Sequence, residues 1–77
     1  IKLPLVIKID NQNLKIYLKI ENILREIDLI SYYSIKNFDK NYIYYEIIFN
    51  GTPQNFIKIM NDRNYNFDTQ NKIWVLK

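Results

Sequence analysis

The sequence predicts a small α+β domain with a ferredoxin-like sandwich, in which two helices cover one face of a four-stranded antiparallel sheet. Two observations carry this prediction. Apolar residues alternate with a period of two in the strand-like segments, and they recur at helical spacing in two others. The resulting order, strand-helix-strand-strand-helix-strand, is typical of the split βαβ fold. The 77 residues are enough for one such domain and leave no room for a second core.

The first half-motif is a strand followed by an amphipathic helix. Leu5, Ile7 and Ile9 alternate with polar or smaller positions between residues 3 and 10, and Pro4 fits only the start or the edge of a strand. Residues 10–13 then form a turn. A helix is expected over residues 13–28 with Asn13 as its N-cap. Its apolar face comprises Ile16, Tyr17, Ile20, Ile23, Leu24 and Ile27.

The second half-motif is a hairpin, a short helix and a closing strand. Strands over residues 30–37 and 42–50 are rich in Ile, Tyr and Phe, and they flank a polar turn at 38–41. In the second strand, alternation places the side chains of Ile43, Tyr45, Ile47 and Phe49 in the core. The alternate residues Tyr42, Tyr44, Glu46 and Ile48 are expected on the outer face. Thr52 and Pro53 are an N-cap and a first helical residue for a helix that ends near residues 61–64. Residues 66–71 are expected to form a loop, and residues 72–77 the last strand.

Several of these positions resemble a known family. The first helix carries Tyr17, Ile20 and Leu24; Phe49 to Pro53 read Phe-Asn-Gly-Thr-Pro; and Phe56, Met60 and Phe67 precede a closing Ile73-Trp74-Val75-Leu76. This spacing resembles the C-terminal ferredoxin-like module of the DUF2066 family of proteobacterial envelope proteins. The resemblance implies a non-catalytic module in the periplasm or envelope, with no catalytic residue and no cofactor.

Composition excludes several classes of function. The chain has no His and no Cys, which removes His/Cys metal sites, thiol catalysis, disulfides and triads that depend on His. No apolar run approaches the roughly 20 residues of a membrane span, so we expect no transmembrane segment. The net charge of +3 is small for a dedicated nucleic-acid binder. The chain begins at Ile1, and we therefore expect it to be a fragment of a longer protein.

Several known functions of the ferredoxin-like fold require particular residues in the loop after the first strand. Acylphosphatase chemistry needs an anion-cradling loop with an Arg, a heavy-metal-associated domain needs two Cys, and amino-acid sensors use a glycine. The loop here reads Asp10-Asn11-Gln12-Asn13. The eight carboxylates lie on turns and solvated faces, Glu46 is expected to be partnered by Lys8, and Ser31 and Ser34 have no base. The sequence therefore predicts no enzyme.

The open face of the sheet is the candidate site. Alternation places both tyrosines and lysines there, together with apolar residues and one carboxylate. The expected members are Val6, Lys8, Tyr32, Ser34, Lys36, Tyr42, Tyr44, Glu46 and Ile48, with Trp74 or its neighbours on the last strand.

Three interpretations of this face remain. Tyrosine is a good strand former, so the residues can be structural only. Aromatic residues between lysines on a four-stranded sheet also resemble the way an RNA recognition motif stacks bases, although Glu46 and the missing glycine-aromatic signature oppose that use. The sequence favours protein contact, through the open face or a strand edge, with a protein partner, another domain of the parent chain or a second copy in a homodimer. The alternative is weak single-stranded nucleic-acid binding by Tyr32, Tyr44, Lys8 and Lys36.

Overall fold

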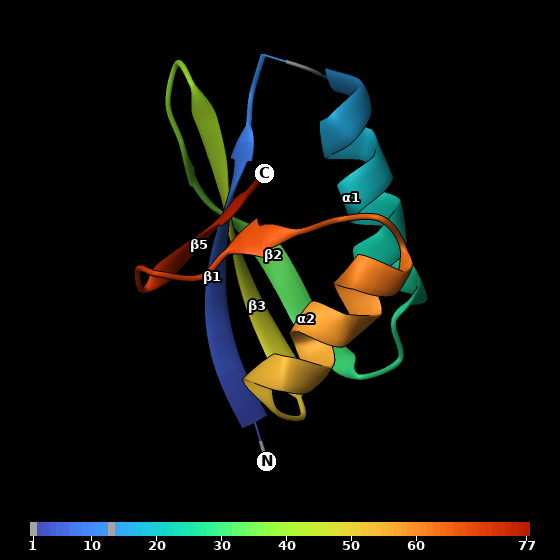
Figure 1. Cartoon of the computed structure of the whole chain (residues 1–77). Coiled ribbons are helices and arrows are strands. Elements are labelled where there is room, and N and C mark those ends of the chain that lie inside the picture. The colour runs from blue at the N-terminus through green and yellow to red at the C-terminus, as the bar shows by residue number, and fades with distance from the viewer. Residues whose placement is uncertain (1, 13) are drawn as a thin grey trace.

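The fold is an α+β arrangement of two helices and one five-stranded mixed sheet (Figure 1). The computed structural model describes residues 2–12 and 14–77. Its elements are β1 (Lys2–Asp10), α1 (Leu14–Glu26), β2 (Ile30–Phe38), β3 (Tyr42–Asn50), α2 (Pro53–Asp62), β4 (Phe67–Asp68) and β5 (Ile73–Leu76). The predicted N-cap, Asn13, lies outside the described residues.

The centre of the sheet follows the predicted pattern. β1 pairs antiparallel with β3 over nine residues, from Lys2 opposite Asn50 to Asp10 opposite Tyr42. This register aligns the inward positions of both strands, so Leu5 faces Ile47 and Ile9 faces Ile43. β2 pairs antiparallel with the other side of β3. A one-residue slip would move these apolar sets to solvent, which is why the register is well defined.

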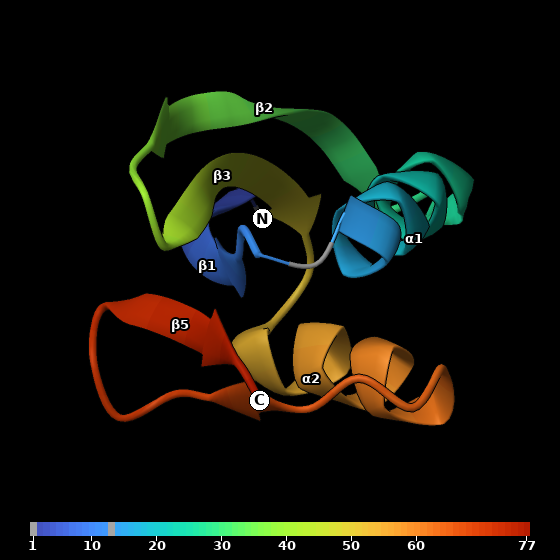
Figure 2. The ribbon, with the colours of Figure 1, turned by 90° about the horizontal axis from the view of Figure 1, so that it is seen from above.

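Both helices lie on one face of the sheet, as predicted (Figure 2). α1 contributes Ile20 and Leu24 to the core, Ile27 adds to it directly after the helix, and α2 contributes Phe56 and Met60. Phe56 forms an edge-to-face contact with Phe49 of β3, with ring centroids 5.3 Å apart. The strand residues that complete the core are Leu5, Ile7, Ile9, Ile43, Tyr45, Ile47, Phe49 and Phe67.

The two ends of α2 follow from local sequence. Thr52 caps the N-terminus: its hydroxyl accepts a hydrogen bond of 3.1 Å from the backbone N–H of Asn55. At the C-terminus Asn64 adopts a positive φ of 69°, and the N–H of Tyr65 donates to the carbonyl of Met60 at 2.9 Å. A 6→1 bond beside a left-handed residue is a Schellman motif, and Asn tolerates that conformation better than most residues. The chain therefore turns sharply toward the sheet.

The prediction of four antiparallel strands is wrong at the C-terminal end. The sheet has five strands in the order β2-β3-β1-β5-β4, and β5 runs parallel to β1. Phe67 lies in the segment expected to be a loop, but it is buried against Phe56 and starts the two-residue strand β4. The Asp68 carboxylate then accepts the N–H of Gln70 at 3.1 Å, a local turn that sends the chain back. β5 is the return arm of this hairpin, so it enters beside β1 in the parallel direction.

Candidate binding surface on the open face of the sheet

The face of the sheet opposite the helices carries the predicted candidate residues. We call it the open face. Residues that are paired across neighbouring strands form three rows on it. The first row joins Tyr32, Ile48 and Pro4, the second joins Ser34, Glu46, Val6 and Ile73, and the third joins Asn37, Tyr44, Lys8 and Val75. These three rows therefore bring together seven of the ten predicted residues, all except Lys36, Tyr42 and Trp74.

Trp74 does not belong to this face. It pairs with Ile7, whose side chain points into the core, and its ring lies 6.0 Å from that of Phe56. Because β5 runs parallel to β1 in this register, Ile73 and Val75 are the β5 residues on the open face. The prediction named Trp74 or its neighbours: Trp74 itself faces the core, and its neighbours Ile73 and Val75 lie on the open face.

Lys36 reaches the open face by a different route from the one predicted. Regular alternation would place it opposite Tyr44, but the β2–β3 register shifts between Ile35 and Asn37, so Asn37 takes that position. Lys36 is the extra residue of this bulge. It still borders the surface, because it lines the same hollow as Tyr44.

One end of the open face is organised around Asp39, in the turn between β2 and β3. Its carboxylate accepts the backbone N–H groups of Asn41 and Tyr42, each at 2.8 Å, and the Tyr44 hydroxyl lies 3.4 Å away. The hydrogen bonds from Asn41 and Tyr42 lower the pKa of Asp39 below its ordinary value, and the nearby charge of Lys8 acts in the same direction. Asp39 is therefore a fixed negative charge beside the tyrosines.

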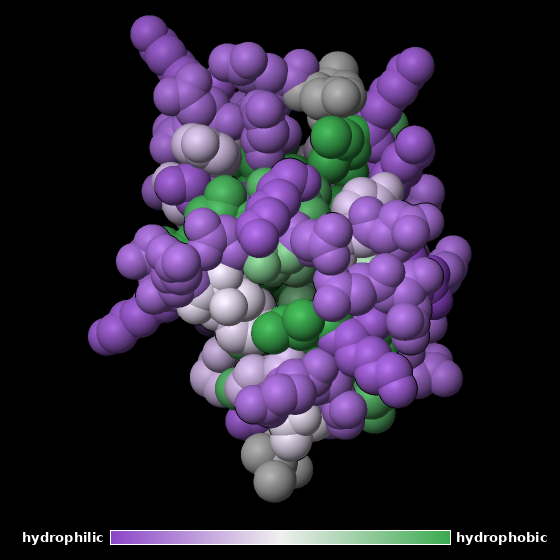
Figure 3. Space-filling view, in the orientation of Figure 1, coloured by the Kyte–Doolittle hydropathy of each residue, from purple (hydrophilic) through white to green (hydrophobic). Residues whose placement is uncertain are grey.

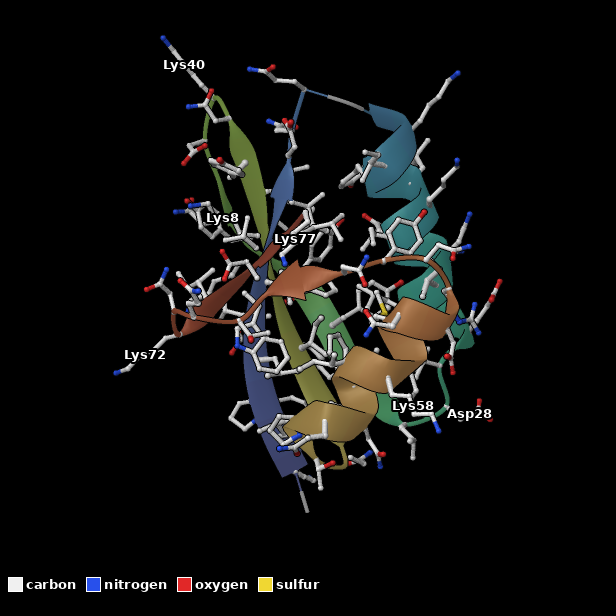
Figure 4. All side chains as sticks on the ribbon, viewed as in Figure 1. Lys8, Asp28, Lys40, Lys58, Lys72 and Lys77 are labelled. Carbon is white, nitrogen blue, oxygen red and sulfur yellow. The ribbon has the colours of Figure 1, made fainter. Side chains whose placement is uncertain are left out.

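Lys8 is held by the same cluster. Its Nζ lies 4.2 Å from the centroid of the Tyr42 ring and 5.9 Å from that of Tyr44, both within the range of a cation–π contact. Lys8 lies on the side of the sheet away from the helices, between two hairpin tips marked by Lys40 and Lys72 (Figure 4). The expected partnership of Lys8 with Glu46 is wrong in register, because Val6 faces Glu46 and Lys8 faces Tyr44.

An open hollow of about 240 Å³ lies in the middle of this face. Its lining consists of Val6, Lys36, Asn37, Tyr44 and Ile73, which come from β1, β2, β3 and β5. In the view from above, the β2–β3 and β4–β5 hairpins project to the same side of the molecule, away from both helices (Figure 2). Both hairpins contribute to the hollow, since Lys36, Asn37 and Tyr44 come from β2 and β3 and Ile73 comes from β5.

The sequence did not reveal a second polar cluster, which lies between α1 and the sheet. The hydroxyl of Tyr45 donates to Glu21 at 2.7 Å, and the rings of Tyr45 and Tyr17 lie 6.2 Å apart. Burial, followed by the bond to Glu21, raises the pKa of Tyr45, and hydrogen bonding to Glu21 raises the pKa of Tyr17. The sequence predicts a solvated carboxylate at Glu21, and only the three-dimensional contact with Tyr45 reveals its position in this cluster. The cluster satisfies a buried hydroxyl and joins α1 to β3.

The edges of the sheet are poorly suited to strand addition. β2 carries two register shifts against β3, near Ser31 and at Lys36, and β4 at the other edge has only two residues. Bulges, lysines and short edge strands all oppose pairing with another chain. The helix side of β2 is nevertheless not fully covered, since Ile35 is 45% exposed and Phe38 is 70% exposed.

The surface seen from the front is mostly hydrophilic, with apolar residues in a broken strip down its middle (Figure 3). Within residues 2–12 and 14–77, no group of three or more acidic side chains is arranged to hold a metal ion. Neither α1 nor α2 is long and apolar enough to cross a membrane.

Comparison with protein-family models, with curated proteins and with solved structures found no match to this chain. The resemblance to the DUF2066 module therefore stays a prediction.

Proposed function

We propose that this domain is a non-catalytic docking module that binds a protein partner through the open face of its sheet. The observation that carries the proposal is the concave, part-apolar hollow between the two hairpins, lined from four strands. Tyrosines, aliphatic residues and a small number of charges are the composition typical of the centre of a protein interface. The helix-covered face, by contrast, is occupied by the core.

The open face is preferred over the strand edges as the docking surface. Two bulges interrupt β2, and β4 is too short to template a further strand. The open face offers Tyr32, which is 51% exposed, and Ile73, which is 38% exposed, beside half-buried Tyr44 and Ile48. A partner that covers these residues removes apolar and aromatic area from water, which favours association.

Crosslinking from two matched positions tests this proposal. Tyr32 and Phe38 are exposed aromatic residues of the same strand that lie on opposite faces of the sheet. Each is replaced in turn by a photoreactive phenylalanine analogue in the natural host, and the adducts are resolved by mass. A discrete protein adduct from position 32 and none from position 38 supports docking through the open face. An adduct from position 38 alone, or equal adducts from both, overturns it.

Single-stranded nucleic acid is the second candidate, and the observation that favours it is the exposed ring of Tyr32 on the strand that also carries exposed Lys36. Two features oppose it. Lys8 already lies over Tyr42 and occupies that ring, and the acidic residues Glu46 and Asp39 flank the tyrosines. An amide-shift NMR titration with a short mixed-sequence RNA at low and physiological salt separates the two functions. Saturable, salt-weakened shifts on the strands of Tyr32 and Tyr44 support nucleic acid, and their absence removes it.

A further inference from the structure

The joint between β3 and α2 contains an Asn-Gly pair. Asn50 is the last residue of β3, Gly51 is the only glycine of the chain, and Pro53 begins α2. Figure 1 shows this joint at the end of the sheet where β1 begins. Asparagine is among the chemically labile residues of proteins, and glycine after it has no Cβ to hinder attack by the backbone nitrogen. Every other asparagine of the sequence is followed by a residue with a side chain. Asn50 is therefore the asparagine with the least hindered neighbour.

Packing keeps glycine at position 51. A Cβ there would lie 2.8 Å from Cε2 of the Phe49 ring, which is fully buried and in edge-to-face contact with Phe56. A contact this short forces the ring to move, so any other residue at position 51 is penalised. Asn50 itself is half-buried and Thr52 is exposed, so water reaches the joint. The core thus imposes the labile pair at a position that solvent can reach.

Two restraints hold the joint. On one side, the N–H of Asn50 donates to the carbonyl of Leu29 at 2.7 Å. On the other side, the Thr52 hydroxyl accepts the N–H of Asn55 at 3.1 Å and caps α2. Deamidation requires the Gly51 nitrogen to approach the Asn50 side chain, which takes Asn50 out of the extended conformation of a strand. Local opening of the joint, with the cap as the restraint on the reacting side, therefore controls the rate.

We infer that Asn50 is a site of spontaneous covalent modification, at which the backbone converts the side-chain amide to aspartate and isoaspartate. The Gly51 nitrogen bonds to Cγ of Asn50, the Cγ–Nδ2 bond breaks, and the side-chain nitrogen leaves as ammonia with the proton that the Gly51 amide gives up. Water then opens the five-membered imide ring. Cleavage of the bond to Cγ gives aspartate, and cleavage of the bond to the backbone carbonyl carbon gives isoaspartate. Water is the only co-reactant.

The two products act differently on the joint. Asn50 belongs to the open-face set of β3 and is paired with Lys2 of β1, so either product adds a negative charge at the end of the open face. Aspartate keeps the backbone path, and Lys2 opposes its charge across the strands. Isoaspartate adds one carbon to the backbone path before Gly51, which displaces Gly51 from the Phe49 ring or Thr52 from its cap. The isoaspartate form should therefore be the less stable of the two.

The experiment follows the whole chain during incubation under physiological conditions. Samples are digested, mass spectrometry locates the mass increase caused by replacement of –NH2 by –OH, and chromatography separates aspartate peptides from isoaspartate peptides. We expect conversion at Asn50 before any other asparagine. Conversion should be slower in the folded protein than in guanidinium chloride, where the joint is open. Earlier conversion of another asparagine, or no conversion of Asn50 in the folded protein, overturns the assignment.

Three variants keep the test specific. Asn50→Gln should not convert at this position on the same time scale, because glutamine must close a larger ring. Thr52→Ala should convert about fivefold faster, which is the factor that loss of an N-cap gives in an opening equilibrium. Lys58→Gln, at an exposed position of α2, should convert at the rate of the natural protein (Figure 4). Equal rates in Thr52→Ala and Lys58→Gln contradict control by the cap.

The stability of the products is the second readout. Ion-exchange chromatography separates the incubated protein, and Asn50→Asp provides the aspartate product as a reference. Thermal unfolding of the isoaspartate fraction should occur at a lower temperature than that of Asn50→Asp. Equal melting temperatures would overturn the proposed effect of isoaspartate on the joint.

Discussion

The two faces of β3 differ in how far their side chains are buried. The residues that point toward the helices, Ile43, Tyr45, Ile47 and Phe49, are between 0 and 7% exposed. The alternate residues Tyr42, Tyr44, Glu46 and Ile48 are all half-buried. The helix side is packed by both helices and by β1, whereas the open side keeps tyrosine hydroxyls, a carboxylate and a hollow.

This difference indicates where stability and binding reside. Buried residues that contact many neighbours set the free energy of unfolding, and partly exposed residues on a rigid sheet are available for a partner. Substitutions on the helix side should therefore lower stability, and substitutions on the open side should change binding. The predictions below test that separation, starting from the largest expected effect.

The largest effect is expected from Ile47→Ala, because Ile47 is fully buried. Truncation of a buried isoleucine costs about 2–5 kcal/mol of unfolding free energy. Tyr44→Ala, on the open face of the same strand, should cost about 1 kcal/mol or less, since the residue is half-buried and loses only long contacts with Lys8 and Asp39. Urea denaturation measures both variants. Equal losses would mean that the two faces are assigned the wrong way round.

Gly51→Ala should be the next most damaging change. A Cβ at this position would lie 2.8 Å from Cε2 of Phe49, whose ring is fully buried and packed on Phe56. The added methyl group forces the ring to move, and overpacking of this kind costs about 1–3 kcal/mol. Phe49→Leu serves as the control background, because a shorter side chain should remove most of the cost of Gly51→Ala. A neutral Gly51→Ala variant would contradict this packing.

Tyr45→Phe tests the polar cluster beneath α1. The variant keeps the ring and loses the hydroxyl that donates to Glu21 at 2.7 Å. A hydrogen bond to a charged acceptor contributes about 1.5–3 kcal/mol, and Tyr17 beside Glu21 should offset part of the loss. We therefore expect a loss of about 1–2 kcal/mol at pH 7 in thermal or urea unfolding. Tyr44→Phe, which has no such partner in the core, is the matched control.

The same cluster predicts a loss of stability at alkaline pH. The pKa values of Tyr17 and Tyr45 are raised in the folded state above the ordinary value of 10.0, so the folded protein holds protons that the unfolded chain releases. Stability is then fully present below pH 10 and falls as the pH rises above it. Unfolding free energies between pH 8 and 11.5 should show this decline, and Tyr45→Phe should make it shallower. A decline of the same slope in that variant would exclude Tyr45 as its source.

The smallest of these stability effects concerns the cap of α2. Thr52→Ala removes the hydroxyl that accepts the N–H of Asn55, and loss of an N-cap costs about 1 kcal/mol. Thr52→Ser retains a hydroxyl and should differ little from the natural protein. A Thr52→Ser variant as unstable as Thr52→Ala would show that the methyl group, and not the cap, is responsible.

The sequence was sufficient for those parts of the fold that depend on local patterns. Alternation in β1 and β3 predicted which residues are buried, and Thr52-Pro53 predicted the start of α2, because periodicity and capping act within a few residues. The direction of β5 could not be predicted in this way. It depends on Phe67 docking against Phe56 and on the turn at Asp68, which are tertiary contacts within a polar-looking segment.

The candidate site was predicted to a similar extent. Strand alternation identified Val6, Lys8, Tyr32, Tyr44 and Ile48 as neighbours on the open face. It assigned Trp74 to the wrong face because that assignment depended on the direction and register of β5. The bulge at Lys36 has no glycine to mark it in the sequence, and the Tyr45–Glu21 bond joins residues 24 positions apart.

The most direct test of the central claim compares two variants by the yield of the adduct crosslinked at position 32. Tyr44→Ala should lower the yield at least about tenfold, the loss expected when an interface anchor is truncated, while the melting temperature changes little. Ile47→Val should reduce the free energy of unfolding by about 0.5–1.5 kcal/mol and so lower the melting temperature. It should leave the yield of the adduct unchanged. If Ile47→Val reduces the yield and Tyr44→Ala does not, the open face is not the binding surface of this domain.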